Sequence, residues 1–278
     1  MATPCTPEAT EPNPPKKALF FGTSAKQGFV VVKAGSEKVQ YDVHKTLLTY
    51  HSKYFSSALN GSWKEAEENS ITLNDIDPKT FGVFVHWLYT QKIATEEEVD
   101  HMLETYPSDE HDDDPYITVL TKAVVFGNRF LVPDFCKAAQ NHIVDSIFDR
   151  DEIRNPTFLY ASKYAFENLL DEHLICTFFI DAHCRYMVCK GSYMDRITTG
   201  WFKENLPRTF LVGLIEKYSV LLAKRSGLGG LDYINCCMYH AHTDDRDRDK
   251  CKRKRRFADC VRRIWDSERE KFVDKYTR

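Results

Sequence analysis

Two cysteines and two histidines near the end of the chain have a spacing that suits a metal site. Cys237, His240, His242 and Cys251 follow the pattern C-x2-H-x-H-x8-C. Thiolate sulfur and imidazole nitrogen suit zinc, and four such ligands complete the tetrahedral shell of a structural site. Histidines two positions apart on an extended segment point the same way, so both can reach one ion. These four residues are therefore candidate ligands of a structural zinc ion, with Cys236 as an alternative ligand and with no open position for catalysis.

The same residues also admit a simpler interpretation. The chain has 9 cysteines, and in a sequence without an export signal buried reduced thiols are the default expectation, ahead of metal binding. The cluster would then be thiols and surface histidines, and the protein would have no cofactor. We find no serine-hydrolase elbow, phosphate-binding loop, zinc-protease helix or dinucleotide fingerprint in the sequence. We therefore expect no catalytic residues, no enzyme activity and no small-molecule substrate.

A basic run flanks Cys251 on both sides. It consists of Lys250, Lys252, Arg253, Lys254, Arg255 and Arg256. Runs of this kind serve as nuclear-import signals or contact phosphates. Aspartates interleaved with arginines at 244–249 partly neutralise the charge, so a solvated loop that enters the final helix is the alternative.

Composition indicates a folded protein without a membrane segment. Of its 278 residues 42% are hydrophobic and 13% aromatic, which is ample for a packed core. No stretch approaches the ~20 consecutive apolar residues of a membrane helix. The net charge of -3 argues against nucleic acid as a partner of the whole protein. Residues 1–18 are proline-rich and lack a secretory apolar core, so we expect a disordered tail and an intracellular protein of the nucleus, the cytoplasm or both.

The first half of the chain predicts a mixed structure. Residues 29–33 and 39–43 flank turn-forming residues and indicate a β-hairpin. Apolar residues at helical spacing predict one helix over 47–59, which the pair Asn60-Gly61 ends. A short strand is expected at 71–73. The next helix is expected to begin at Asp77, as the capping residue, with Pro78 in its first turn.

The rest of the chain predicts helices. Residues 95–98 have the spacing of a capping box, and the acidic segment 108–115 is expected to be a solvated loop. Helical spacing continues beyond it, with starts at Pro133 and at Asn155-Pro156 and a last amphipathic helix over 257–272. The expected fold class is α+β. A head at 19–150, with its core at 28–94, precedes a helical body at 151–278 that contains the Cys/His segment 236–251.

Several motifs of the head are similar to one known family. They are V-H-K-x-x-L at 43–48, S-K-Y-F at 52–55, L-x-D-x-D-P at 73–78, W-L-Y-T at 87–90 and F-G-N-R-F at 126–130. In this combination the head closely resembles the BTB/POZ family, and the helical body resembles the tails of fungal BTB proteins. The resemblance implies a protein-interaction fold that dimerises, recruits cullin-class ubiquitin ligase scaffolds or joins transcriptional regulators. From the residues alone, His44 is expected to be structural, Tyr54 and Phe55 core, and Trp87 and Tyr89 core or interface aromatics.

Trp63 and Glu65 are the candidate partner contacts. Family members that bind a cullin place a bulky apolar residue, a spacer and a glutamate at this position, and Trp63-Lys64-Glu65 fits that pattern. An exposed indole can fill a groove on a partner, and a carboxylate can fix its orientation. The alternative is that Trp63 folds back on the head as a lid.

The sequence therefore leads to an adaptor, a candidate substrate-recruiting subunit of a cullin-based ubiquitin ligase. A nuclear BTB-type transcriptional regulator and a self-associating structural protein are the alternatives. Exchange of an N-terminal segment between two copies, which many BTB domains use, is not expected because the residues before Phe29 are few and proline-rich.

Overall fold

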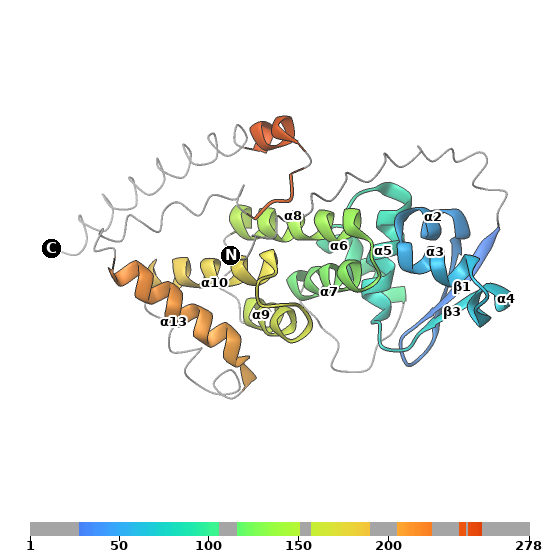
Figure 1. The fold of residues 1–278 in the computed structure, drawn as a ribbon, viewed down its shortest axis with the longest axis horizontal. Helices are drawn as coiled ribbons and strands as arrows, with labels where there is room; N and C mark the ends of the chain where they lie inside the picture. Colours follow the sequence, from blue (N-terminus) through green and yellow to red (C-terminus); the bar gives the residue numbers. More distant parts are fainter. Residues whose placement is uncertain are drawn as a thin grey trace, which may run out of the picture.

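The computed structural model describes residues 28–105, 116–150, 157–189, 205–223, 239–242 and 244–251 (Figure 1). The elements, in chain order, are β1 Phe29–Ala34, β2 Val39–His44, α2 Lys45–His51, α3 Lys53–Asn60, α4 Lys64–Glu68, β3 Ser70–Leu73, α5 Pro78–Thr90, α6 Glu96–Thr105, α7 Tyr116–Arg129, α8 Pro133–Arg150, α9 Thr157–Asn168, α10 Leu174–Cys189 and α13 Arg208–Ala223. A short helix also covers 245–251. The predicted α+β class is confirmed: the three strands and the short helices between them come first, and every described element after β3 is a helix.

The sheet contains three strands in the order β2-β1-β3. β1 and β2 form the predicted antiparallel hairpin, with Val30 opposite Val43. β3 runs parallel to β1, with Val32 beside Ile71. Alternate residues of β1 are fully buried, because successive side chains of a strand point to opposite faces. This alternation places one face of the sheet on the core of the head.

The single helix predicted over 47–59 is wrong, since the chain breaks at Ser52 into α2 and α3. Ser52 is extended, with φ -121 and ψ 123, and its Oγ accepts a hydrogen bond from the backbone N–H of Phe55. The same hydroxyl donates to the carbonyl of Phe130 at 2.6 Å. Ser52 is therefore the N-cap of a new helix, held by a partner 78 residues away in the sequence. The predicted end at Asn60-Gly61 is confirmed.

Two other helix starts are as predicted. Asp77 caps α5 by accepting from the N–H of Lys79, and Pro78 occupies the first turn. At α6 the Oγ1 of Thr95 accepts from the N–H of Glu98, whose carboxylate accepts from the N–H of Thr95 at 2.7 Å. Hydrogen bonds from Thr95 hold the pKa of Glu98 below its usual range. Both starts depend on residues close in sequence, which is why the pattern reveals them.

Aromatic side chains dominate the core of the head. Phe55 is fully buried and stacks on Phe130, with ring centroids 5.6 Å apart. Trp87, also buried, packs against Phe84 and Phe135. The expectation that Tyr54 is core is wrong, because it remains 41% exposed while its ring packs edge-on against Phe130. The core thus joins α3 and α5 to the helices α7 and α8.

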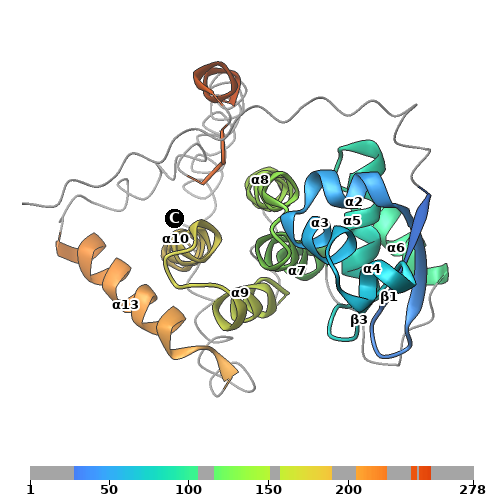
Figure 2. The same cartoon turned by 45° about the vertical axis from the view of Figure 1, so that its right-hand side comes forward.

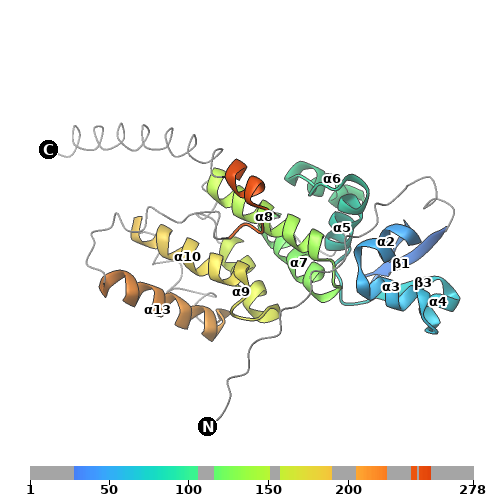
Figure 3. The same ribbon diagram turned by 45° about the horizontal axis from the view of Figure 1, so that its top comes forward.

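The described helices of the body pack on this core and on one another. α7 packs on both α8 and α9, and α10 packs on α9 and α13 (Figures 2 and 3). The helical spacing expected here is matched by buried apolar stripes on α7 and α8, and Phe178 and Phe179 of α10 are also buried. The stripes are Val119, Ala123 and Phe126 on α7 and Ala139, Ile143 and Ile147 on α8. α13 buries only part of its apolar surface: Phe210 and Leu214 are buried, whereas Ile215 is 65% exposed. The short helix at 245–251 lies beside α8 (Figure 3).

Several predicted features lie outside the described residues. They are the N-terminal tail, the acidic segment 108–115, the Asn155-Pro156 start, Cys236, Cys237, the run 252–256 and the last helix at 257–272. Among the described helices, none is long and apolar enough to cross a membrane.

Candidate functional site

Trp63 stands at the exposed start of α4. The backbone N–H groups of Ala66 and Glu67 bond to its carbonyl, so it is the residue from which the helix begins. Its side chain is 66% exposed, and Glu65 is partly buried one position into the helix. The alternative in which Trp63 covers the head as a lid does not fit this exposure. The indole and the carboxylate are both available to a partner on the same short helix.

The far end of α4 is fixed to the sheet. Asn69 adopts a left-handed conformation with φ 50, which ends the helix. Its side-chain amide donates to the carbonyl of Phe29 at 2.5 Å, and its own carbonyl accepts from the N–H of Val31. Phe29 is itself 50% exposed. Asn69 therefore ties the end of α4 to the first residues of β1, which gives Trp63 a defined position on the head.

His44 has the structural role expected of it. Its Nδ1 lies 2.8 Å from the hydroxyl of Tyr89, which also accepts from the backbone N–H of His44. The imidazole packs against the ring of Phe29, with centroids 4.2 Å apart. Tyr89 is 44% exposed, so its edge reaches the surface beside Phe29. Tyr89 is predicted to be a core or interface aromatic, and its exposure favours the interface.

Polar residues of the family motifs hold the head together. Arg129 of α7 forms an ion pair with Asp75, which precedes α5, and this guanidinium lowers the pKa of the Asp75 carboxyl. Lys122 pairs with the capping carboxylate of Asp77 at 3.4 Å. These contacts join motifs that are distant in sequence. They give these charged side chains a role in the fold of the head.

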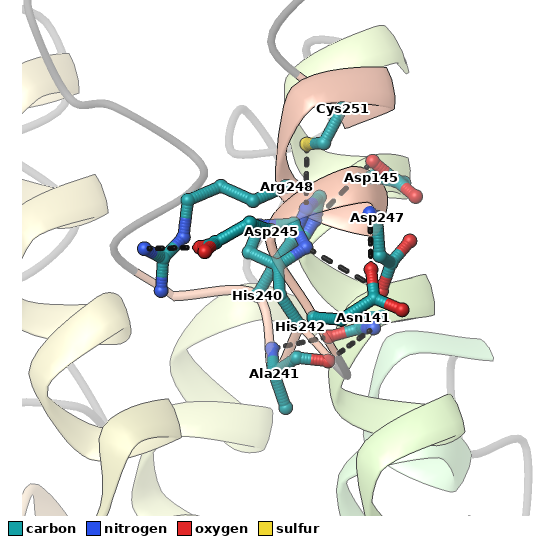
Figure 4. Close-up of polar contacts among 10 residues, drawn as sticks. Asn141, Asp145, His240, Ala241, His242, Asp245, Asp247, Arg248 and Cys251 are labelled. Carbon is teal, nitrogen blue, oxygen red and sulfur yellow. Dashed lines mark hydrogen bonds and ion pairs between the residues drawn. The ribbon is translucent and has the colours of Figure 1, made fainter.

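A second candidate site lies where the segment 239–251 meets α8 (Figure 4). The structure brings together three of the predicted zinc ligands, since ligand atoms of His240, His242 and Cys251 all lie within 4.8 Å of one another. Nδ1 of His240 lies 3.2 Å from Sγ of Cys251. Both imidazole side chains are only 6% exposed. The predicted ligand Cys237 and its alternative Cys236 lie outside the described residues.

Residues that the sequence analysis did not select position this cluster. Asn141 of α8 accepts from the N–H of Ala241 at 2.9 Å and donates to the carbonyl of Ala241 at 3.5 Å. The side chain of Asp244 accepts a hydrogen bond from the N–H of Asp247 at 2.8 Å and so caps the helix 245–251. Cys251, at the other end of that helix, lies next to His240. No local pattern reveals Asn141, because it meets its partner 100 residues later.

Tyr239 anchors the same segment to the body. The side chain is 2% exposed, packs against Phe178 and donates its hydroxyl hydrogen to the carboxylate of Asp181. Lys217 of α13 neutralises that carboxylate at 2.5 Å. Burial and the bond to Asp181 raise the pKa of the Tyr239 phenol, so it stays protonated and keeps donating. Gln140 adds a bond to the Tyr239 carbonyl at 2.7 Å.

Buried thiols elsewhere are as the simpler interpretation predicts. Cys176 and Cys184 are free and fully buried. Burial is the main cause that raises the pKa of each to about 12, and it raises that of Cys136 to about 11. These thiols are therefore protonated at neutral pH and are poor nucleophiles.

The basic run is represented only by Lys250, which is exposed on the helix 245–251. Arg248 and Asp245 on the same helix form an ion pair at 3.5 Å, consistent with the expected local neutralisation. Nuclear import and phosphate contact by 252–256 stay predictions.

Comparison with known proteins identifies the family that the head resembles. Residues 26–108 match the family model of the BTB/POZ domain. Over 74 residues the chain is 34% identical to BTB and MATH domain-containing protein 15 of Caenorhabditis elegans. The aligned stretch covers 27% of this chain and 26% of that protein. Over 80 residues it is 30% identical to Kelch-like protein 3 of Homo sapiens and of Bos taurus. This aligned stretch covers 28% of this chain and 14% of each relative.

The chain thus spans about a quarter or less of the length of these relatives. The matched segment contains the sheet, helices α2 to α6 and the exposed Trp63. The match and the observed fold agree with the motifs read from the sequence. Residues 26–108 of this chain form a BTB/POZ domain.

Proposed function

We propose that this protein is an adaptor whose BTB/POZ domain docks on a cullin-class scaffold through Trp63 and Glu65, while the helical body positions a target. The observation that carries the proposal is the 66% exposure of Trp63 at the start of α4. A large aromatic side chain left in water is costly to the free protein and becomes favourable when a partner groove covers it.

The geometry supports one defined contact. α4 is short, but Asn69 fixes its end to Phe29 and Val31 of β1, so little order is lost on binding. Glu65 lies two residues after Trp63 and can accept a charge-assisted bond from a cation beside the groove. The body's resemblance to fungal BTB tails suggests a fungal-type member of the family, and target recruitment is assigned to that part.

Affinity purification of the tagged full chain, with cullins quantified by mass spectrometry, tests the proposal. The double variant Trp63→Ala/Glu65→Ala is expected to lower cullin recovery by roughly 30-fold, the loss of a hot spot of about 2 kcal/mol. Its melting temperature should hardly change, because surface substitutions usually stay within about 0.5 kcal/mol.

The matched control is Ile215→Ala/Glu216→Ala on α13. Ile215 is 65% exposed and Glu216 is also exposed, so this variant removes similar surface from the body. It should retain full cullin recovery. Equal recovery with the Trp63/Glu65 variant and the unaltered chain would remove these residues as the anchor, and absence of cullins from both would favour self-association or a nuclear partner instead.

A further inference from the structure

We propose that His240, His242 and Cys251 bind a zinc ion that fastens the 239–251 segment to α8. This inference goes beyond the adaptor function and is independent of it. In Figure 1 α4 lies at the right-hand end of the molecule, whereas the short helix 245–251, drawn in red, lies above α8 and away from α4. Either proposal can fail without the other.

The spacing of the donor atoms suits one ion. Zinc–nitrogen bonds of about 2.1 Å and zinc–sulfur bonds of about 2.3 Å place neighbouring ligand atoms of a tetrahedron roughly 3.4–3.6 Å apart. Nδ1 of His240 and Sγ of Cys251 are 3.2 Å apart, and all three residues fit within 4.8 Å. Small side-chain rotations close the remaining gap. Two imidazoles and a thiolate select zinc over magnesium or calcium, which prefer oxygen.

Each imidazole has a carboxylate near the nitrogen that the metal would leave unused. Nε2 of His240 lies 3.3 Å from Oδ1 of Asp145, and Nδ1 of His242 lies 3.6 Å from Oδ2 of Asp247. Zinc-bound histidines usually donate their second ring N–H to such a group, which orients the ring and strengthens its bond to the metal. We therefore assign Nδ1 of His240 and Nε2 of His242 as the ligand atoms.

Without a metal the cluster is poorly satisfied. Nε2 of His240 and Nε2 of His242 are buried and make no hydrogen bond, and the approach of Asp145 lacks the alignment of one. A buried polar atom without a partner costs about 1–3 kcal/mol, so two of them in one cluster need a reason. A zinc ion bound to Nε2 of His242 satisfies that atom directly. It also holds the His240 ring so that its Nε2–H can face Asp145.

The rival interpretation is a nucleophilic thiol. Cys251, His240 and Asp145 are arranged in the order thiol, base and orienting carboxylate. That arrangement gives no role to His242, which is equally buried in the same cluster. Zinc uses both imidazoles and both carboxylates, and we favour it for this reason. The fourth ligand is a separate question, for which the sequence pattern predicts Cys237.

The site would act as a structural clamp. Asn141 and Asp145 are four residues apart on α8 and so share one face of that helix, where they contact Ala241 and His240. The ion would close the loop from His240 to Cys251 and fix the capped helix 245–251 on that face. Zinc sites of this kind contribute directly to folding stability.

The test is the metal content of the untagged full chain, purified without chelator and measured by mass spectrometry of the elements. We expect about one zinc ion per chain. His242→Ala and Cys251→Ser should reduce it at least 10-fold, whereas His101→Ala on the exposed face of α6 and Cys136→Ala on α8 should leave it unchanged. Asp145→Asn keeps all three ligands, and competition with a chromophoric chelator should show a 10–100-fold weaker affinity.

Circular dichroism identifies any variant that does not fold. If a variant fails to fold, cobalt titration of the unaltered chain tests whether the cluster binds a metal ion. A thiolate-to-cobalt charge-transfer band and a tetrahedral visible spectrum are expected. An unaltered chain that is metal-free as purified, and binds zinc no better than His242→Ala, would overturn the proposal. If Cys251 in that metal-free chain is also alkylated faster than in His240→Ala, the residues form a thiol–imidazole pair instead.

Discussion

Replacing Ser52 with alanine tests why the head folds as two helices where the apolar pattern indicates one. The hydroxyl has two partners, the N–H of Phe55 at 3.0 Å and the carbonyl of Phe130 at 2.6 Å. Ser52 is 1% exposed, so water cannot replace either bond without opening the core. Losing an N-cap costs about 1 kcal/mol, and a buried carbonyl that loses its donor costs about 1–3 kcal/mol. Together these two effects should lower the free energy of unfolding by about 2–4 kcal/mol.

The assay is urea unfolding followed by tryptophan fluorescence, since Trp87 is 2% exposed in the same core. The midpoint should fall with an unchanged slope, because the exposed surface on unfolding is the same. Ser57→Ala is the matched control: it lies on the exposed face of α3 and should change stability by less than about 0.5 kcal/mol. If Ser52→Ala is no more destabilising than Ser57→Ala, the hydroxyl does not hold the break.

Three further predictions concern the body. Tyr239→Phe keeps the ring packing but removes the bond to the buried carboxylate of Asp181, so thermal unfolding should show a loss of about 1.5–3 kcal/mol. Burial lowers the pKa of His183 to about 3, below its unfolded value, so the folded state excludes a proton that the unfolded state takes up as pH falls below about 6.5. The stability from this residue is complete above that pH and lost towards pH 3, by up to about 1.4 kcal/mol per pH unit, and urea unfolding of His183→Gln between pH 4 and 7 should show a shallower decline. Cys237→Ser should lower zinc affinity if the sequence-predicted fourth ligand is correct, and unchanged chelator competition would assign that position to another group.

The features of the fold that could be predicted from the sequence are those whose interacting residues lie close together along the chain. The hairpin, the Asp77-Pro78 start and the capping box at Thr95 each involve residues a few positions apart, and all were predicted. The break at Ser52 was missed because its hydroxyl pairs with Phe130, 78 residues away. The apolar spacing of 47–59 continues through the break, so periodicity alone joins the two helices.

The candidate sites follow the same rule. Trp63, His240, His242 and Cys251 were selected because their types and spacing stand out along the chain. Asp145 and Asn141 were missed, because nothing near them in α8 distinguishes them from ordinary surface residues. Their positions beside the cluster follow from the packing of residues 240 and 241 on α8, which a single sequence does not encode locally. Exposure of Tyr54 and Tyr89 likewise depends on how the helices meet.

The central claim is that the BTB/POZ domain binds another polypeptide through the surface that α4 presents. Hydrogen exchange of the purified full chain, with and without a purified cullin scaffold, measures this directly. We predict slower exchange at residues 61–69 on addition of the scaffold, with no such protection in Trp63→Ala/Glu65→Ala. Protection confined to the helical body, with the exchange of α4 unchanged, would contradict the claim.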